Sequence, residues 1–215
     1  MDPYLYALIS TYVPEHFSLL TDLAGGLLIK EIRHGKSYAN GVLHSFNDEP
    51  IVNYQGIQRW YKNGKLHREN DLPAMIYLDG SREWYKNGEK HRDNYLPAVE
   101  WVNGRLEWWQ NGKLHNNSFS PAILDCLYMK WYQHGLLHRD YDSPAIIWSD
   151  GKKEWYQNGE LHRDNDLPAI VNGTRYKIWY QNGLCHRDNG PAVIRWGNKE
   201  YWRNGQQVYS SCVIF

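Results

Sequence analysis

A histidine followed by arginine and aspartate recurs along this chain of 215 residues, four times in full and once as His67-Arg68-Glu69. Protein kinases use such a triplet in their catalytic loop, where the aspartate accepts the proton of the attacking hydroxyl. The chain has no Asp-Phe-Gly sequence and no glycine-rich phosphate loop, and a catalytic site does not recur in every repeat. We therefore predict that the protein is not an enzyme. We interpret the triplets as a structural loop network, in which aspartate accepts backbone hydrogen bonds and arginine packs along aromatic side chains. The network comprises His67, Arg68, His91, Arg92, Asp93, His138, Arg139, Asp140, His162, Arg163, Asp164, His186, Arg187 and Asp188.

Seven histidines recur in phase and raise the question of a metal array. They are His44, His67, His91, His115, His138, His162 and His186, and we number the repeats 1 to 7 after them. If each repeat adds two strands to a sheet, equivalent histidines lie ~9.6 Å apart. Zinc ligands lie ~2.1 Å from the ion, so neighbouring histidines cannot share one. We predict no metal and no cofactor and expect each histidine to bond within its own repeat. We also hypothesise that the phased histidines make stability dependent on pH below about pH 6.5.

Composition excludes several other classes of function. The three cysteines, Cys126, Cys185 and Cys212, are too few and too scattered for a disulfide framework, which favours a reducing compartment. Lys+Arg and Asp+Glu are both 24, which is unlike a nucleic-acid-binding protein and counts against an anionic membrane surface. The first 29 residues contain no Lys or Arg, unlike a secretory signal, and no apolar run is long enough to span a bilayer. We therefore expect an intracellular protein that is not secreted.

The histidines belong to a longer repeat with the core Trp-Tyr-x-Asn-Gly-x-x-His. Six copies begin at Trp60, Trp84, Trp108, Trp131, Trp155 and Trp179, at intervals of 24, 24, 23, 24 and 24 residues. A degenerate copy begins at Ser37 and a truncated one at Tyr201. Pro-Ala follows the histidine in six repeats, and Pro50-Ile51 takes its place in repeat 1. Such phasing indicates a stacked repeat protein.

Each repeat has the signals of a β-hairpin. Asn-Gly between extended segments favours a type I′ turn, and a second turn is predicted at positions such as Asp79-Gly80. Segments 74–78 and 81–86 are typical of strands that flank these turns. The predicted fold is all-β: an elongated antiparallel meander of about seven hairpin units of 22–24 residues, with a short N-terminal helical cap.

Tryptophan and tyrosine are adjacent in most repeats, so an extended chain would point them to opposite faces of the sheet. The tryptophans are candidates for a protein-binding ladder, because Trp, Tyr and Arg anchor many interfaces. The alternative is that they form the core. The candidates are Trp60, Trp84, Trp108, Trp131, Trp155 and Trp179.

The core motif and its spacing resemble the MORN repeat family in a variant form, over about residues 31 to 209. The chain departs from the standard unit by carrying Arg-Asp-Asn-x-Leu-Pro-Ala where that unit is glycine-rich. Similar variant arrays occur in large DNA viruses of amoebae and in some bacteria. The resemblance implies a scaffold for interaction, in some arrays next to a membrane, without catalysis, and it names no partner.

The N-terminal segment favours two helices, at 4–12 and 15–24, which end before Gly25-Gly26. We predict a helical cap over residues 1–30, weakly similar to an F-box, and a repeat array over 31–215. Repeat 4 and the segment after it, residues 108–130, depart most from the pattern, with His115-Asn116-Asn117-Ser118-Phe119 in the loop. We interpret it as an irregular loop or docking point.

The expected function is a scaffold for protein–protein interaction or assembly, with a minor virion or capsid-associated structural protein as its form in a virus. In that setting the protein would reside in the host cytoplasm or the virion. Two alternatives stay open: an F-box-like adaptor that recruits substrates, and a membrane or lipid-associated platform, against which the zero net charge counts. The sequence favours no nucleic acid partner and leaves the oligomeric state open.

Overall fold

The computed structural model describes residues 17–21, 27–33, 36–52, 55–116 and 119–209. The chain divides into two compact units, an N-terminal unit of residues 1–91 and a C-terminal unit of residues 92–215. Every element in the described ranges is a β-strand, and the strands pair antiparallel. The predicted all-β meander is therefore confirmed.

The N-terminal unit contains a four-stranded sheet, part of the meander and two separate hairpins. The first sheet has the order β1 (Phe17–Thr21), β2 (Leu27–Arg33), β3 (Lys36–Ala39), β4 (Val42–Leu43). The meander strands are β5 (Ile51–Val52), β6 (Gln58–Arg59), β9 (Met75–Ile76) and β10 (Arg82–Glu83). The hairpins pair β7 (Tyr61–Lys62) with β8 (Lys65–Leu66), and β11 (Tyr85–Lys86) with β12 (Glu89–Lys90).

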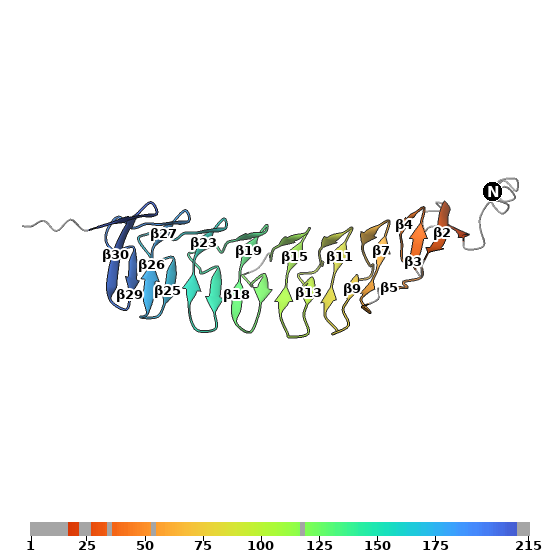
Figure 1. Cartoon of the computed structure of the whole chain (residues 1–215), viewed down its shortest axis with the longest axis horizontal. Coiled ribbons are helices and arrows are strands. Elements are labelled where there is room, and N and C mark those ends of the chain that lie inside the picture. The colour runs from red at the N-terminus through yellow and green to blue at the C-terminus, as the bar shows by residue number, and fades with distance from the viewer. Residues whose placement is uncertain (1–16, 22–26, 34–35, 53–54, 117–118, 210–215) are drawn as a thin grey trace, which may run out of the picture. The chain divides into compact units, whose positions relative to one another are not determined.

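The C-terminal unit repeats the same plan. Its meander runs through β13 (Val99–Glu100), β14 (Leu106–Glu107), β17 (Ile123–Leu124), β18 (Tyr128–Lys130), β21 (Ile146–Trp148), β22 (Lys153–Glu154), β25 (Ile170–Asn172), β26 (Tyr176–Ile178), β29 (Val193–Arg195), β30 (Asn198–Arg203) and β31 (Gln206–Val208). Its hairpins are β15 (Trp109–Gln110) with β16 (Lys113–Leu114), β19 (Tyr132–Gln133) with β20 (Leu136–Leu137), β23 (Tyr156–Gln157) with β24 (Glu160–Leu161), and β27 (Tyr180–Gln181) with β28 (Leu184–Cys185). Within this unit the hairpins form a row beside the row of meander strands (Figure 1).

Each repeat therefore has four short strands, two in the meander and two in a hairpin, and not the two predicted from the sequence. The extra break lies at the tryptophan. The Trp155 N–H donates to the Ala169 carbonyl at 2.8 Å, while the Trp155 carbonyl accepts from the His162 N–H at 3.1 Å. Because the residue bonds to the meander on one side and to the hairpin on the other, the chain turns out of the sheet there. The predicted continuous strand over 81–86 is wrong for this reason, since β10 and β11 flank Trp84.

The two predicted turns are confirmed. In the Asn-Gly turn both residues are left-handed, as a type I′ turn requires, with φ of 50° at Asn63 and 78° at Gly64. His134-Gly135 makes the same turn in repeat 5, with φ of 50° and 90°. In the second turn the Asp79 carboxylate accepts the Ser81 N–H at 2.8 Å, which holds the chain reversal locally.

The N-terminal prediction needs a correction. Residues 17–21 of the predicted helix 15–24 are strand β1, paired in register with β2, so that Leu19 lies opposite Ile29. Gly25-Gly26 between two apolar segments is also a hairpin signal, and this interpretation competes with a helix end. The predicted helix over 4–12 lies outside the described residues.

The core lies where the two rows meet. The alanines that follow proline are 0% exposed: Ala74, Ala98, Ala122, Ala145, Ala169 and Ala192. The tryptophans at Trp60, Trp84, Trp131, Trp155 and Trp179 are 4 to 8% exposed, and Trp108 is half-buried. Their indole N–H groups donate to loop carbonyls of the preceding repeat, as Trp155 does to Asp142 at 2.9 Å. This placement favours the core interpretation of the tryptophans over the exposed binding ladder.

Candidate functional site

The phased histidines connect successive repeats. In six of them the ring Nδ1 accepts the backbone N–H at the Asn position of the next Asn-Gly turn. The pairs are His44 with Asn63 at 3.4 Å, His67 with Asn87 at 3.0 Å, His115 with His134 at 3.2 Å, and His138 with Asn158, His162 with Asn182 and His186 with Asn204 at 3.1 Å. The expectation that each histidine bonds within its own repeat did not include this second bond, which joins the ring to the next repeat. The ring is an adaptor between two repeats because its two nitrogens point in opposite directions.

The other ring nitrogen bonds within the repeat. Nε2 of His138 and His162 lies 3.1 Å from the carboxylates of Asp140 and Asp164. These aspartates thus bond to the histidine ring, and not to the backbone as the sequence suggested. A ring Nδ1 that accepts a backbone N–H leaves Nε2 as the nitrogen that can donate to the aspartate.

The arginine after each histidine makes three contacts in the regular repeats. Its guanidinium lies over the tryptophan of its own repeat, 3.8 Å from the ring centre for Arg163 over Trp155. Its Nη1 donates to the proline carbonyl five residues on, Pro168, at 3.2 Å. Its Nε and Nη2 donate to both oxygens of an aspartate in the preceding repeat, Asp142, at 2.7 and 2.9 Å. The predicted packing of arginine along aromatic surface is confirmed.

The same bidentate pair recurs between Arg68 and Asp48 and between Arg187 and Asp166, with distances of 2.6 to 2.8 Å. Hydrogen bonds from the guanidinium lower the pKa of each of these aspartates and of Asp142 below the usual 3.8. The aspartate lies four residues after the histidine, in a turn in which it has positive φ. The sequence analysis did not include this position in the loop network, although Asp occupies it in four repeats.

The glutamates before the tryptophans are a second group that the sequence analysis missed. Glu83, Glu107 and Glu154 are 3 to 6% exposed. Glu107 accepts the indole N–H groups of Trp101 and Trp109 at 3.1 and 2.8 Å, and Arg105 lies 2.8 Å from the same carboxylate. The recurring Glu-Trp dipeptide was the available signal, but burial of a charge is not visible in a sequence pattern.

Repeat 4 lacks both charged partners of this loop scheme. Asn116 stands in place of the arginine, is buried, and donates from Nδ2 to the Pro121 carbonyl at 3.0 Å. Phe119 stands in place of the aspartate and is 80% exposed. The indole of Trp131 still donates to the Phe119 carbonyl at 2.9 Å, so the backbone of the loop keeps its regular place at this residue.

Arg139 of repeat 5 consequently faces Phe119 where the arginines of the regular repeats face an aspartate. Its guanidinium lies 3.8 Å from the Trp131 ring centre, and Nη1 donates to the Pro144 carbonyl at 3.2 Å. Among the described residues, no carboxylate pairs with its Nε and Nη2. Burial lowers the pKa of the Arg139 guanidinium, as expected for a charge that has lost water without gaining a counter-ion.

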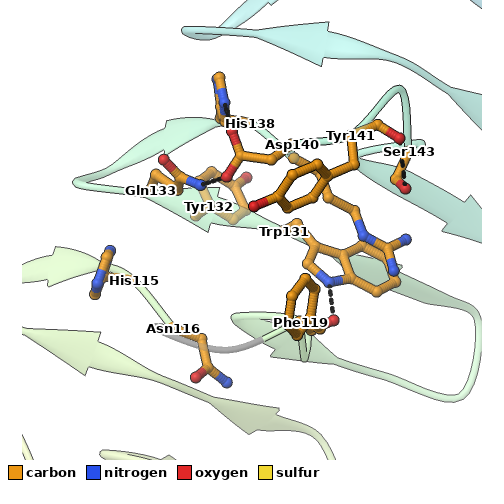
Figure 2. A pocket seen from close by; sticks show the side chains of 11 residues that line it. His115, Asn116, Phe119, Trp131, Tyr132, Gln133, His138, Asp140, Tyr141 and Ser143 are labelled. Atoms are coloured by element: carbon orange, nitrogen blue, oxygen red, sulfur yellow. Dashed lines mark hydrogen bonds and ion pairs between the residues drawn. The ribbon is translucent and has the colours of Figure 1, made fainter.

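A cavity of about 380 Å³ lies beside Arg139. Figure 2 shows Phe119, Trp131 and Tyr141 on one side of it and His115 and Asn116 on the other. The residues that line it are His115, Asn116, Phe119, Trp131, Tyr132, Gln133, His138, Arg139, Asp140, Tyr141 and Ser143. Its one carboxylate, Asp140, is held by Gln133 at 2.7 Å and by His138.

Among the lining groups, burial raises the pKa of Tyr132, and burial together with the charge of His134 lowers the pKa of His115. His115 and His134 stack with ring centres 4.6 Å apart. The cavity therefore combines the guanidinium of Arg139 with aromatic side chains, which suits a monoanion with an apolar neighbour.

The other candidate chemistry is absent from the described residues. No group of three or more His, Cys, Asp or Glu side chains there is arranged to hold a metal ion. Cys126 and Cys185 are free thiols, and burial raises the pKa of Cys185 to about 11, which makes it a poor nucleophile at neutral pH.

No protein-family model matches the chain, and no curated protein sequence matches it either. In the part of the chain that the structure describes, no helix has the length and apolar character needed to cross a membrane.

Proposed function

We propose that the protein is a non-enzymatic scaffold that binds other proteins through the loops of repeats 3 to 5. The observation that carries the proposal is a set of exposed aromatic side chains in three successive loops. Tyr95 is 74% exposed, Phe119 is 80% exposed and Tyr141 is 83% exposed. We call these three residues the loop aromatics.

The loop aromatics occupy positions that are polar in most of the other repeats. Asp48, Asp71 and Asp166 stand at the position of Tyr95 and Phe119, and Asn165 stands at that of Tyr141. The rings of Phe119 and Tyr141 lie 6.1 Å apart in a tilted arrangement, so they present one continuous surface beside the cavity. Large exposed aromatic side chains next to an arginine are the residue types that anchor protein interfaces.

Repetition supplies the rigidity that such a surface needs. Each junction within a unit carries a His–backbone bond, and the turn glycine adds another, as Gly159 does when it donates to the Leu137 carbonyl at 2.8 Å. The loops of an array braced in this way are already ordered before a partner binds. Binding then does not lose the conformational entropy of these loops. Partners in a larger assembly, including a virion, fit the same proposal.

No observation in the described residues favours the two alternatives. The adaptor hypothesis relied on two N-terminal helices, and residues 17–21 of the second are a strand. The lipid platform would need a basic or apolar membrane-facing surface, and the formal net charge is zero.

The test is quantitative co-purification from the native source with three full-length baits. They are the unmodified chain, the double variant Phe119→Asn with Tyr141→Asn, and the control Val102→Asn, which removes an exposed apolar side chain (68% exposed) from the opposite turn. We expect a near-stoichiometric partner with the unmodified chain and the control, and at least about tenfold less with the double variant. Equal recovery with all three baits would contradict the proposal.

A further inference from the structure

Three junctions between repeats show what the loop arginine binds when it is satisfied. At Arg68, Arg163 and Arg187 the Nε–Nη2 edge holds an aspartate side chain of the preceding repeat, with N···O distances of 2.6 to 2.9 Å. In each case the guanidinium is fixed over a tryptophan, within 3.8 to 4.0 Å of its ring centre. The fork is thus preorganised for one planar carboxylate, which is the geometry that guanidinium groups match best.

Arg139 has the same fixed geometry and lacks the carboxylate. It stacks on Trp131 at 3.8 Å and donates to the Pro144 carbonyl, as its counterparts do. The residue that would supply the acid is Phe119, whose carbonyl is held by Trp131 in the regular way while its side chain is exposed. Among the described residues, no acidic side chain takes the vacant place.

The space beside Arg139 is large enough for an external group. The cavity there measures about 380 Å³, whereas the equivalent one between repeats 5 and 6, where Asp142 is bound to Arg163, measures about 180 Å³. A cavity of about 390 Å³ in the N-terminal unit lies beside Arg68, but that guanidinium already holds Asp48. Of these three cavities, the one at Arg139 is large and also lies beside a guanidinium whose Nε–Nη2 edge binds no carboxylate of the described residues.

We propose that Arg139 binds an aspartate or glutamate side chain of a partner polypeptide, which takes the place that Asp142 and Asp166 take at the regular junctions. This inference rests on the proposed scaffold function and names the chemistry of its partner. The loop aromatics Phe119 and Tyr141 flank the cavity and would pack on the residues beside that acid. The Asp140 carboxylate in the same cavity repels a dianion such as phosphate more strongly than a single carboxylate, because the repulsion grows with the charge of the ligand.

The array itself supplies the probe. A blocked peptide with the sequence Asn-Asp-Leu-Pro, which occurs at residues 165–168 with its aspartate bound to Arg187, carries the required acid in its native context. The matched control is the blocked peptide Asn-Asn-Leu-Pro. Titration into the full chain is followed by the NMR signals of the Arg139 Nε–H and the Trp131 indole N–H. We expect saturable shifts with the Asp peptide and at least about tenfold weaker binding of the Asn peptide.

Three variants locate the binding. Phe119→Asp restores the acid within the chain, so peptide binding should disappear while the protein gains stability. Arg139→Gln should also abolish the shifts and provides the same test if Phe119→Asp fails to fold. Asp142→Phe vacates the fork of Arg163 and should create a second peptide site.

Two results would overturn the inference: equal affinity for the Asp and Asn peptides, or undiminished binding to both Phe119→Asp and Arg139→Gln. The scaffold proposal fails separately, when the loss of Phe119 and Tyr141 leaves co-purification unchanged. A protein partner that needs the loop aromatics but tolerates Arg139→Gln would support the scaffold and contradict the carboxylate site.

Discussion

At the scale of single residues, the buried glutamates show how a charge is made compatible with a β core. Glu83 accepts from the hydroxyl groups of Tyr77 at 3.1 Å and Tyr85 at 2.6 Å and pairs with the Lys90 ammonium at 3.2 Å. Burial and the nearby Glu83 carboxylate raise the pKa of Tyr77 to about 12, so the phenol remains a donor at physiological pH. Both oxygens of the acid are satisfied, and burial is tolerated because no lone charge is left.

Replacing the Glu83 carboxylate should lower the stability of the protein, although the change in side-chain shape is small. Glu83→Gln keeps the shape but loses the charge and one oxygen acceptor, and we expect the free energy of unfolding to fall by about 1–3 kcal/mol. Glu89→Gln, on the exposed side of the hairpin β11–β12, should change it by less than about 0.5 kcal/mol. Urea unfolding of both variants measures the difference, and equal effects would show that the buried network contributes nothing.

His134 is a residue whose type does not suit its place. It has φ of 50° where the other repeats have asparagine, and it stacks on His115. Asparagine tolerates left-handed backbone better than most residues and carries no second imidazole. His134→Asn should therefore raise the melting temperature by a few degrees, with a larger gain at pH 5.5 than at pH 8. Differential scanning calorimetry at both values tests this, with Asn158→His as the reverse change in a regular repeat.

At the scale of elements, successive hairpins are joined by hydrogen bonds from the backbone of one turn to the histidine ring and backbone of the hairpin before it. Sheet pairing contributes little to these contacts. Each hairpin has only two residues per strand, which is marginal by itself. Two hydrogen bonds tie the tip of one hairpin to the base of the hairpin before it. The Asn158 N–H donates to His138 Nδ1, and the Gly159 N–H donates to the Leu137 carbonyl. The row of hairpins is thus held by contacts between repeats.

Removing one imidazole should loosen one junction. His162→Ala deletes the acceptor of the Asn182 N–H, 3.1 Å away, and leaves that donor to solvent. We expect a loss of about 1 kcal/mol in the free energy of unfolding and faster hydrogen exchange at Asn182. The exchange of Asn158, bonded to His138, is the internal control. Unchanged exchange at Asn182 would show that the bond is not formed in solution.

At the scale of the whole molecule, stability should be modular because the regular repeats of one unit contact their neighbours through the same bonds. Deletion of residues 155–178, one 24-residue period, joins Glu154 to Trp179 and brings Asp142 to Arg187 in phase. Circular dichroism should then show a folded chain that unfolds at a lower urea concentration. Deletion of residues 155–166 breaks the phase and should abolish cooperative unfolding. Equal behaviour of the two deletions would contradict the modular account.

The response to pH also belongs to the whole molecule, because it sums over junctions. Burial lowers the pKa values of His44 and His115 below 6.5, so as the pH falls the unfolded chain takes up protons first. This stability contribution is therefore complete above pH 6.5 and is lost as the pH falls through that value. The lowered pKa values of Asp48, Asp142 and Asp166 add a second loss, which begins below pH 3.8.

Urea unfolding between pH 5 and 8 should give a free energy of unfolding that is flat above pH 7 and declines below 6.5. The double variant His44→Gln with His115→Gln should flatten the decline, since glutamine does not titrate. A midpoint that stays constant from pH 5 to 8 in the unmodified chain would show that these imidazoles contribute nothing to its pH dependence.

The period, the turns and the antiparallel pairing could be predicted from the sequence because their causes are local. Left-handed φ at Asn63 and Gly64 follows from the residues themselves, and it sets the hairpin register whatever surrounds it. The helix predicted over 15–24 was wrong at residues 17–21 because pairing with β2 decided their conformation, and local propensity is weak against such pairing.

The tertiary structure decided everything that depends on the contact between one repeat and the next. The break at each tryptophan, the bond of His162 to Asn182 and the pairing of Arg163 with Asp142 join residues of different strands or repeats. The vacancy at Arg139 exists only because Phe119, twenty residues earlier, lies where an acid would be. A sequence lists both residues, but only the stacking of repeats brings that loop and that guanidinium to the same place.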